Sequence, residues 1–475
     1  MQVKEEIAII GAGIAGLSAA YELDKLIQAA NLPYKICLYE SKAEIGGNIK
    51  TTYLEDTLVE LGPEAFITQN NKILDLIEEL GLSSDLISMN PNHRRTFIYH
   101  QGKLKPLPDG FRLFAPTNFT SFYSSSLFSF KAKLRVLADL FLTPVPAEID
   151  QSVADYVKRR FGQEVYDKVA EPMISSIYGG NVNKLSANFV LKLFRHQELK
   201  HGSVVRGLWK TAKSGIKESG PRYGLFMTLK YGLSSLCKAL VKNLPTNSIQ
   251  CNKSVNQITP CQNGYTIEFT DNSKVPVAGI ICATPAYATS TMIKSWNPQL
   301  ANKLNQIEYS SVIMINLIFD KLSIGRDITG FGYVVPSLEE KFLKACSFSS
   351  CKFPDRTASD KIWLRAFICG DIAKANLHKS EQDLLAQAQN ELSEILDLKA
   401  NPISGNVIKY PDSMPQYQVG HSKLIESINN DLNNYPNIKL CGNAYNGVGI
   451  PDCVANGTQS SQELIKVLNT AKLKC

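Results

Sequence analysis

Ile7-Ala-Ile-Ile-Gly-Ala-Gly-Ile-Ala-Gly16, near the N-terminus, is the stretch that decides the expected fold. Its first four residues predict a buried parallel strand, and its G-x-G-x-x-G loop leads into a predicted helix at Leu17–Ala30. The three glycines permit, in order, a tight turn out of the strand, close approach of a diphosphate, and close packing of the helix on the sheet. Free N–H groups at the start of the helix would bind that diphosphate. The stretch therefore predicts a dinucleotide-binding βαβ unit.

A second strand and an acidic residue complete this unit. Lys35–Tyr39 is predicted as a strand and ends at Glu40, which follows the loop by about twenty residues, where an acid can bind ribose hydroxyls. Gly46-Gly47 and Leu61-Gly62-Pro63 come soon afterwards, and glycines so placed allow the backbone to lie against a cofactor.

The C-terminal part of the chain carries a second glycine-rich junction. A predicted strand, Ile438–Cys441, is followed by Gly442-Asn-Ala-Tyr-Asn-Gly-Val-Gly449 and by a predicted helix that opens with Ile450-Pro-Asp452. Two such junctions fit FAD better than NAD. The first would hold the adenine–ribose–diphosphate half, and the second the ribityl and isoalloxazine half. The expected fold is α/β, with a Rossmann-like FAD-binding domain that is discontinuous in the sequence.

Length and composition predict a globular protein of two or three lobes. The chain has 475 residues, of which 44% are hydrophobic and 20% charged. Its eleven cysteines are scattered without a CxxC pair, which predicts reduced thiols and no metal site. Met-Gln-Val-Lys-Glu-Glu leads at once into the first strand, so no signal peptide is expected and the expected location is the cytoplasm.

Positive charge gathers in two windows of the sequence. Residues 94–135 contain eight Lys or Arg and one acid, and residues 195–230 contain eight and two. Two interpretations stay open: solvated surface faces, or attraction of an anionic substrate or an anionic membrane surface. Nucleic acid is not an expected partner, because no recognised binding module accompanies the charge.

The last part of the first charged window, together with the residues up to Thr143, contains an amphipathic pattern. Residues 113–130 carry no charge, but their seven Ser or Thr argue against a membrane span. Lys131–Thr143 has apolar residues at Leu134, Leu137, Leu140 and Phe141, which predicts an amphipathic helix. We expect this helix to pack against the protein's own core, with shallow membrane docking as the alternative.

Further elements follow from periodicity and turn residues. Helices are predicted at 73–80, 132–142, 153–161, 165–177 and 380–396, and strands at 264–270, 312–319, 330–335 and 362–368, with a further strand that ends in a loop at 279–285. His196 and His201 are five residues apart on a predicted helix and so do not share a face for a metal. His421 is expected to be a structural hydrogen-bonding residue.

Collinear motifs over residues 5–467 resemble the oxygen-dependent protoporphyrinogen/coproporphyrinogen oxidases of haem synthesis, in the amine-oxidase-like flavoprotein superfamily. Besides the two glycine-rich junctions and Glu40, they are Glu60-Leu-Gly-Pro-Glu64, Glu171-Pro-Met-Ile-Ser-Ser-Ile-Tyr-Gly-Gly180, Tyr223-Gly-Leu-Phe-Met-Thr-Leu-Lys-Tyr-Gly-Leu233, Phe353-Pro-Asp355, Met414-Pro-Gln-Tyr-Gln-Val-Gly-His421 and Gly447-Val-Gly-Ile-Pro-Asp-Cys453. The last motif is most similar to the Gram-positive bacterial branch, whose members oxidise coproporphyrinogen III.

The resemblance implies three regions and a set of contacts. The regions are an FAD-binding domain at 1–72, 222–290 and 405–475, an α+β mixed-sheet substrate domain at 291–404 with parts of 73–92 and 206–221, and a helical, membrane-facing domain at 93–205. The implied contacts to non-covalent FAD are Gly11, Ala12, Gly13, Ile14, Ala15, Gly16, Glu40, Ser41, Gly47, Gly62, Pro63, Glu64, Ala65, Val255, Tyr410, Val448, Gly449 and Ile450. The implied substrate residues are Phe367, Val334, Ser347, Ser176 and Arg95.

This sequence departs from the family pattern at several of these positions. The family often places Trp where Tyr410 stands, and plant enzymes often place Gly where Ser176 stands. Eukaryotic members hold a propionate with an Arg, whereas the aligned position here is Thr96. This difference favours the copro substrate and leaves Arg94, Arg95 and Lys103 as candidate carboxylate anchors.

The resemblance also implies the chemistry. A porphyrinogen loses six electrons in three two-electron steps, flavin N5 accepts hydride, and O₂ reoxidises the flavin with release of H₂O₂. The remaining protons leave through tautomerisation of the macrocycle, so no catalytic residue is assigned and the protein is expected to contribute positioning.

Alternatives and partners stay open at this point. Protoporphyrinogen IX is the alternative substrate, and an amine oxidase, a carotenoid desaturase and a tetrapyrrole carrier are the rival functions. Porphyrinogen and O₂ are the implied partners, and no metal is implied. A homodimer, a downstream ferrochelatase and a peripheral contact with the inner face of the cell membrane are further partners that the resemblance leaves open.

Overall fold

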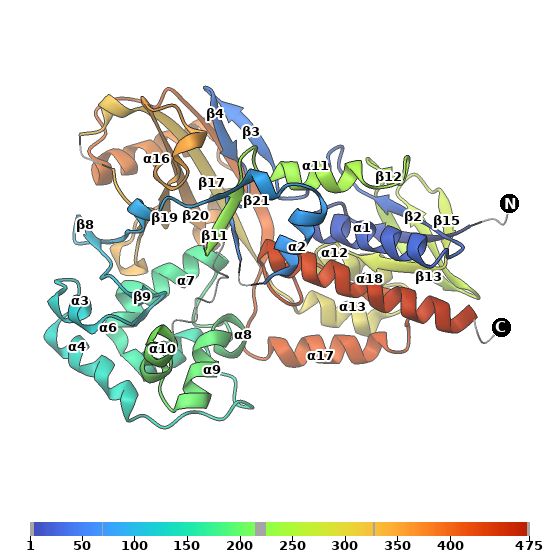
Figure 1. The fold of residues 1–475 in the computed structure, drawn as a ribbon, viewed down its shortest axis with the longest axis horizontal. Helices are drawn as coiled ribbons and strands as arrows, with labels where there is room; N and C mark the ends of the chain where they lie inside the picture. The colour runs from blue at the N-terminus through green and yellow to red at the C-terminus, as the bar shows by residue number, and fades with distance from the viewer. Residues whose placement is uncertain (1–3, 69, 214–224, 326–327, 473–475) are drawn as a thin grey trace.

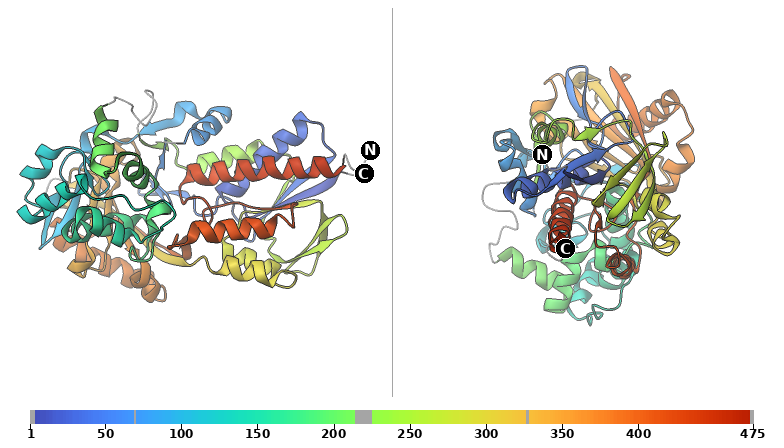
Figure 2. Two further views of the ribbon diagram at one scale, coloured as in Figure 1. Left: turned by 90° about the horizontal axis from the view of Figure 1, so that it is seen from below. Right: turned by 90° about the vertical axis from the view of Figure 1, so that its right-hand side faces the viewer.

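The computed structural model describes residues 4–68, 70–213, 225–325 and 328–472. A nucleotide-binding half occupies one end of the elongated molecule, and both termini lie there (Figure 1). A mixed sheet and a block of helices form the other end, as two further views show (Figure 2). The predicted parts 214–221 of the substrate domain and 222–224 of the FAD-binding domain lie outside the described residues.

The nucleotide-binding half is built on a five-stranded sheet in which every pair is parallel. Its order is β12 (Ile249–Gln250), β2 (Tyr34–Tyr39), β1 (Glu5–Ile10), β16 (Gly279–Cys282) and β22 (Ile438–Leu440). These strands are near-continuous apolar runs because parallel sheets are covered on both faces. The N-terminal, central and C-terminal parts of the chain all contribute, which confirms the discontinuous α/β fold.

Two hydrophobic cores lie on the two faces of this sheet. One face packs against α1 (Ile14–Ala29), α2 (Lys72–Glu79), α11 (Ser234–Lys242) and α18 (Ile450–Lys472). The other packs against α12 (Ala286–Ile293), α13 (Pro298–Asn305), α17 (His421–Leu432) and a small sheet of β13 (Val255–Cys261), β14 (Gly264–Phe269) and β15 (Lys274–Val277). Helices α1 and α18 lie side by side (Figure 1), so the two glycine-rich junctions begin neighbouring helices.

The second half is organised by a seven-stranded mixed sheet. Its order is β21 (Ser404–Pro415), β17 (Tyr309–Asp320), β20 (Lys361–Cys369), β19 (Ala345–Phe348), β18 (Gly332–Val334), β7 (Thr96–His100) and β8 (Lys103–Pro106). Only the β18–β7 pair is parallel among these. One face is covered by α15 (Gly370–Asn376) and α16 (Glu381–Leu396).

The opposite face of the mixed sheet packs against the helical block. Ile98, Val334 and Ala345 on the sheet share one buried cluster with the helices. These are mainly α3 (Phe119–Ser124), α4 (Phe130–Leu137), α5 (Val153–Phe161), α6 (Gln163–Val165), a π-helix (Tyr166–Ala170), α7 (Glu171–Tyr178), α8 (Ala187–Val190), α9 (Lys192–His201) and α10 (Val204–Lys213).

Short strands and a short helix complete the fold. They include β3 (Thr51–Leu54), β4 (Thr57–Glu60), β5 (Phe66–Ile67), β6 (Leu86–Ser88), β9 (Phe111–Arg112), β10 (Ala115–Pro116), β11 (Phe226–Leu229) and α14 (Ser349–Lys352).

Two sequence assignments differ from the observed pairing. Residues 93–205 were expected to form a helical domain, but β7 and β8 extend the mixed sheet, because β7 pairs in parallel with β18 and β8 pairs with β7. Strand β21, placed by sequence with the FAD-binding residues 405–475, pairs with β17 along most of its length.

The predicted amphipathic helix buries only part of the face that was expected: Leu140 packs against the core of the helical block, and Leu137 is half-buried. Leu134 is 51% exposed and Phe141 86% exposed, whereas Ala132 and Val136 face the core. The smaller pair is buried because α4 lies close against its neighbours in the helical block. In the described part of the chain, no helix is both long enough and apolar enough to cross a bilayer.

Candidate active site

The loop after β1 has the backbone geometry that its glycines require. Gly11 has φ of 102°, and a Cβ on Gly16 would lie 1.9 Å from the carbonyl oxygen of Gly11. By contrast, a Cβ on Gly13 would meet nothing within 4 Å. Gly16 is therefore required by packing, whereas Gly13 borders open space into which a ligand can fit.

Glu40 closes the same edge of the sheet at the end of β2. Its carboxylate is buried and accepts hydrogen bonds from the N–H of Ala12 (2.7 Å) and the N–H of Lys42 (2.9 Å), with the Ser41 hydroxyl at 3.2 Å. The N–H of Lys253 donates to the Glu40 carbonyl at 2.8 Å, and Val255 follows two residues later. The structure thus brings Glu40, Ser41 and Val255 together beside the glycine loop.

The second glycine pair and the C-terminal junction lie next to this loop. Gly46 forms an isolated bridge with Gly13, and a Cβ on Gly47 would lie 3.1 Å from the Cα of Gly13. At the start of α18, the N–H of Gly449 donates to the Asp452 carboxylate at 3.3 Å. Because β1, β2 and β22 are parallel, their carboxyl ends share one edge, where a dinucleotide is expected to bind.

The loop 61–65 connects this edge to the mixed sheet. The Tyr410 hydroxyl donates to the Leu61 carbonyl at 2.5 Å, and burial raises the pKa of Tyr410 to about 12. Arg365 Nη2 donates to the Gly62 carbonyl at 2.5 Å. Two strands of the mixed sheet therefore hold the loop by its backbone carbonyls.

Glu64, in the same loop, is the centre of a buried ion cluster. Its Oε2 lies 3.1 Å from Lys352 Nζ and 3.4 Å from Arg365 Nη1. Burial alone would raise the pKa of Glu64, but the positive charges of Lys352 and Arg365 outweigh it and lower the pKa to about 2. Glu64 is therefore a carboxylate at neutral pH.

Three predicted substrate residues share one face of the mixed sheet. Phe367 pairs with Ala345, and Ala345 pairs with Val334 on the next strand. Ser347 is two residues from Ala345 and therefore points to the same side. This face is the one that turns toward the helical block.

The remaining two predicted substrate residues, Ser176 and Arg95, occupy different positions relative to this sheet face. Ser176 lies on α7, which packs over β18 and β20, and its hydroxyl donates to the Met173 carbonyl at 2.9 Å. Arg95 is exposed at the start of β7, where strand alternation directs Thr96 rather than Arg95 toward the face that carries Val334. The structure thus places Ser176 across from the sheet face but does not bring Arg95 to it.

Sequence reasoning missed the basic residues that hold the loop. Arg365 interrupts the apolar run Lys361–Cys369, and a charge inside a buried strand was the available signal. Lys352 and Arg356 carried no comparable signal. Arg356 Nη1 lies 3.3 Å from Glu60, whose carboxylate also accepts from the N–H of Leu233 at 2.8 Å.

His421 was expected to be a structural hydrogen-bonding residue, and the structure buries it among aromatic rings while its Nε2 lacks a hydrogen-bond partner among the described residues. It is buried against Phe189 and Tyr417, with ring centroids 4.7 and 4.9 Å away, and burial lowers its pKa to about 4. Among the residues that the structure describes, acidic, histidine and cysteine side chains form no cluster able to bind a metal.

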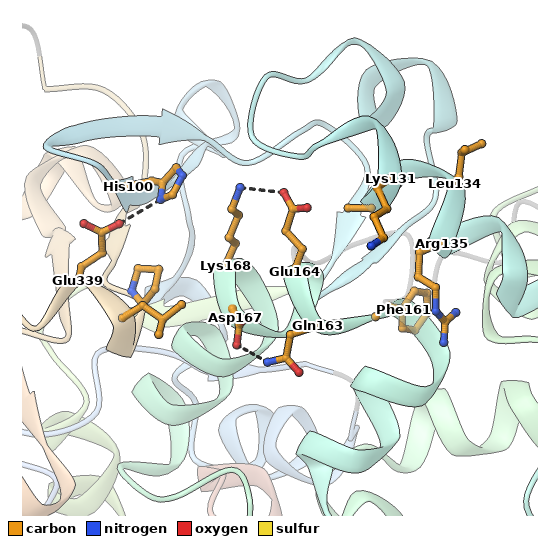
Figure 3. Close-up of a pocket in the computed structure, with 14 residues that line it drawn as sticks. His100, Lys131, Leu134, Arg135, Phe161, Gln163, Glu164, Asp167, Lys168 and Glu339 are labelled. Atoms are coloured by element: carbon orange, nitrogen blue, oxygen red, sulfur yellow. Dashed lines mark hydrogen bonds and ion pairs between the residues drawn. The ribbon is translucent and has the colours of Figure 1, made fainter.

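A separate cleft of about 690 Å³ opens where the helical block meets the edge of the mixed sheet (Figure 3). Lys168 pairs with Glu164 in it at 2.8 Å, and His100 pairs with Glu339 at 3.0 Å. None of the predicted site residues lines this cleft. Because the predicted site residues lie elsewhere, this cleft is not the candidate active site.

A comparison with known families identifies the chain's relatives. The family described as flavin containing amine oxidoreductase matches residues 14–465. The chain belongs to this family. It is therefore an oxidoreductase and a flavoprotein, and the family assignment agrees with a dinucleotide site at the shared edge of β1, β2 and β22.

Individual relatives match almost from end to end. Coproporphyrinogen III oxidase of Bacillus subtilis is 29% identical over 470 residues, covering 98% of this chain and 99% of the relative. The enzyme of the same name from Staphylococcus aureus is 29% identical, covering 98% and 100%. Chloroplastic protoporphyrinogen oxidase 1 of Spinacia oleracea is 27% identical, covering 98% and 84%.

Solved structures confirm the fold. A crystal structure assigned as a protoporphyrinogen oxidase from Exiguobacterium sp. 255-15 has a TM-score of 0.84 at 26% identity, covering 99% of both chains. A putrescine oxidase variant has a TM-score of 0.71 at 15% identity and shows the fold alone.

Proposed function

We propose that the protein catalyses the FAD-dependent, oxygen-using oxidation of a porphyrinogen to a porphyrin in haem biosynthesis, with coproporphyrinogen III as substrate. The observation that carries the proposal is the position of Arg365. This residue bonds to the Gly62 carbonyl of the expected cofactor loop and shares a sheet face with Ser347 and Phe367. The full-length similarity to coproporphyrinogen III oxidases supports the choice of substrate.

The residues present fit non-covalent FAD. Open space at Gly13 suits a diphosphate, and the buried Glu40 carboxylate suits a ribose. The residues that we propose to hold the cofactor are Gly11, Ala12, Gly13, Ile14, Ala15, Gly16, Glu40, Ser41, Gly47, Gly62, Pro63, Glu64, Ala65, Val255, Tyr410, Val448, Gly449 and Ile450. Bound flavin supplies a two-electron acceptor that O₂ can regenerate.

The chain's own contribution to the reaction is positioning and exclusion of water. Phe367, Val334 and Ala345 give the sheet face an apolar surface suited to a flat macrocycle. Helix α7 packs opposite and contributes Ser176. Six electrons leave the substrate in three rounds, and three O₂ become three H₂O₂. The protons leave by tautomerisation of the macrocycle, so no side chain is assigned as an acid or base.

A peripheral membrane contact is part of the proposal. Phe130, Leu134 and Phe141 are exposed apolar side chains along one segment, and Lys131 is exposed beside them. An exposed apolar patch with adjacent cations suits an anionic membrane surface. We expect purified protein to float with vesicles that contain anionic lipid, and to stay in the soluble fraction without them. Protein that stays soluble in both cases would contradict the contact.

A paired turnover assay tests the function. FAD-loaded protein receives coproporphyrinogen III or protoporphyrinogen IX in air, and porphyrin fluorescence is followed over time. We expect faster formation of coproporphyrin III. Faster oxidation of protoporphyrinogen IX would reverse the substrate assignment while keeping the reaction class. Oxidation of neither by flavin-loaded protein would overturn the proposed function, and amines and polyenes would then be the substrates to test.

A further inference from the structure

The buried cluster of Glu64, Lys352 and Arg365, here called the junction cluster, lies where the cofactor loop meets the mixed sheet. Glu64 comes from the loop, Lys352 from the end of α14, and Arg365 from the middle of β20. Both basic groups approach the same carboxylate oxygen, Oε2, at 3.1 and 3.4 Å. Two positive charges thus share one negative charge, and the cluster carries a net charge of +1.

The hydrogen bonding of the junction cluster is incomplete. Glu64 is 8% exposed and Arg365 3% exposed. Neither Glu64 Oε1 nor Arg365 Nε has a hydrogen-bond partner among the described residues. A buried charge that lacks a full set of partners destabilises the protein through its desolvation, and a nearby charge of opposite sign offsets this penalty. The unpartnered Arg365 Nε and the net charge of +1 therefore leave the cluster able to receive one more negatively charged acceptor, whereas Glu64 Oε1 is an acceptor that lacks a donor in the described part of the chain.

The cluster is continuous with the proposed substrate face. Arg365 pairs directly with Ser347, whose hydroxyl lies 3.5 Å from Glu64 Oε2. The Phe367 ring centroid is 5.4 Å from the Arg365 guanidinium. Residues two apart on a strand are separated by about 7 Å. A macrocycle lying on Phe367 therefore brings its edge substituents within reach of Lys352 and Arg365.

Lys352 has the freedom to take part. Its side chain is 16% exposed, and its ammonium group can donate three hydrogen bonds. Among the described residues, Lys352 forms one ion pair, with Glu64, so donors are left for a second carboxylate. A charge-assisted contact of this kind is roughly twice as strong as a neutral one.

We propose that Lys352, supported by Arg365, forms a carboxylate subsite that selects a four-carboxylate porphyrinogen over a two-carboxylate one. The inference rests on the proposed function. A substrate carboxylate brings the cluster to neutrality, whereas an apolar vinyl group at the same place leaves the excess positive charge buried. Lys352 is thus a specificity residue, and Glu64 and Arg365 position it.

The test compares Lys352→Met with Lys352→Arg and with Lys341→Met. Lys341 is a matched control, because it pairs with Glu394 at 2.8 Å at similar exposure but on the loop between β18 and β19. Affinities of the FAD-loaded proteins for coproporphyrin III and protoporphyrin IX are measured by fluorescence quenching. KM values for the two porphyrinogens, FAD content and flavin midpoint potential are measured alongside.

Lys352→Met is expected to weaken coproporphyrin III binding about tenfold, as the loss of one charge-assisted contact requires, and protoporphyrin IX binding less than about twofold. Lys352→Arg is expected to retain the preference, and Lys341→Met to match the wild type. FAD content is expected to stay constant throughout.

Three outcomes would overturn the proposal. They are an equal loss for both porphyrins, no change for either, and a shift of the flavin potential without a change in porphyrin affinity, which would assign the charge to the cofactor instead. Failure of the proposed function is distinguishable, because wild-type protein loaded with FAD would then oxidise neither porphyrinogen.

Discussion

The glycine loop 11–16 and the junction cluster both border the candidate site, but they satisfy their polar groups in different ways. The loop keeps its groups within a short span, since Glu40 caps Ala12 and a missing Cβ at Gly16 admits a backbone carbonyl. The cluster joins residues about three hundred positions apart and leaves one positive charge in excess. Substitutions that add side-chain volume should therefore destabilise the loop most, whereas substitutions that change charge should destabilise the cluster most.

The largest expected effect is steric and falls on the loop. Gly16→Ala places a Cβ 1.9 Å from the Gly11 carbonyl oxygen, so the loop must move. We expect destabilisation of about 3 kcal/mol, the upper range for overpacking, together with loss of bound FAD. Thermal unfolding and the ratio of flavin to protein absorbance measure the two effects.

Gly13→Ala is the matched control, because its Cβ meets nothing within 4 Å in the protein. It is expected to fold like the wild type but to bind FAD more weakly. Normal FAD binding by Gly13→Ala would show that this space is not the diphosphate site.

The next effect is electrostatic and falls on the cluster. Glu64→Gln leaves Lys352 and Arg365 without their shared carboxylate, and we expect a loss of about 3 kcal/mol at pH 7. Burial would raise the pKa of Glu64, but the positive charges of Lys352 and Arg365 lower it from its ordinary value of 4.5 to about 2. Its stabilisation is therefore present above pH 4.5 and is lost as the pH falls toward 2.

Urea unfolding from pH 7 to pH 2 measures this dependence. The gap between wild type and Glu64→Gln should close on acidification, while Glu394→Gln, an exposed pair, should follow the wild type at all pH values. A gap that stays constant with pH would contradict the charge assignment.

A smaller effect distinguishes a residue that binds the substrate from one that binds the cofactor. Phe367→Ala removes part of the apolar sheet face, and KM for both porphyrinogens should rise about tenfold, as expected for burying an aromatic side chain. FAD content should not change, because Phe367 lies on the substrate side of Arg365. Steady-state kinetics with both substrates test this. Loss of flavin instead would place Phe367 against the cofactor.

The smallest effect falls on the contact between β21 and the loop. Tyr410→Phe removes the hydrogen bond to the Leu61 carbonyl, and a loss of about 1 kcal/mol is expected. Thermal unfolding should shift by a few degrees, and FAD should stay bound because Tyr410→Phe removes the hydroxyl but keeps the aromatic ring that is proposed to contact the cofactor. An unchanged unfolding temperature would mean that water replaces the hydroxyl.

The same contrast explains what could be predicted from the sequence. The loop, Glu40 and the C-terminal junction were predictable because strand, turn and helix signals are adjacent in the chain. The shared face of Phe367, Val334 and Ser347 was expected only through family resemblance, since strand order depends on distant pairing. The junction cluster was missed because nothing near Glu64 in the sequence indicates Lys352 or Arg365.

The amphipathic segment 131–143 shows a second limit of prediction from the sequence. Its hydrophobic periodicity predicted that Leu134 and Phe141 would face the core, yet both are largely exposed. Periodicity marks an apolar face but does not say which neighbour covers it. Here Ala132 and Val136 are the residues of α4 that face the buried core of the helical block.

Anaerobic mixing of FAD-loaded protein with coproporphyrinogen III tests the central claim most directly. Flavin and substrate are proposed to share one site, so the visible flavin absorbance should fall on mixing and recover when air is admitted, while coproporphyrin III appears. An oxidised flavin spectrum that does not change under an excess of either porphyrinogen would contradict the account.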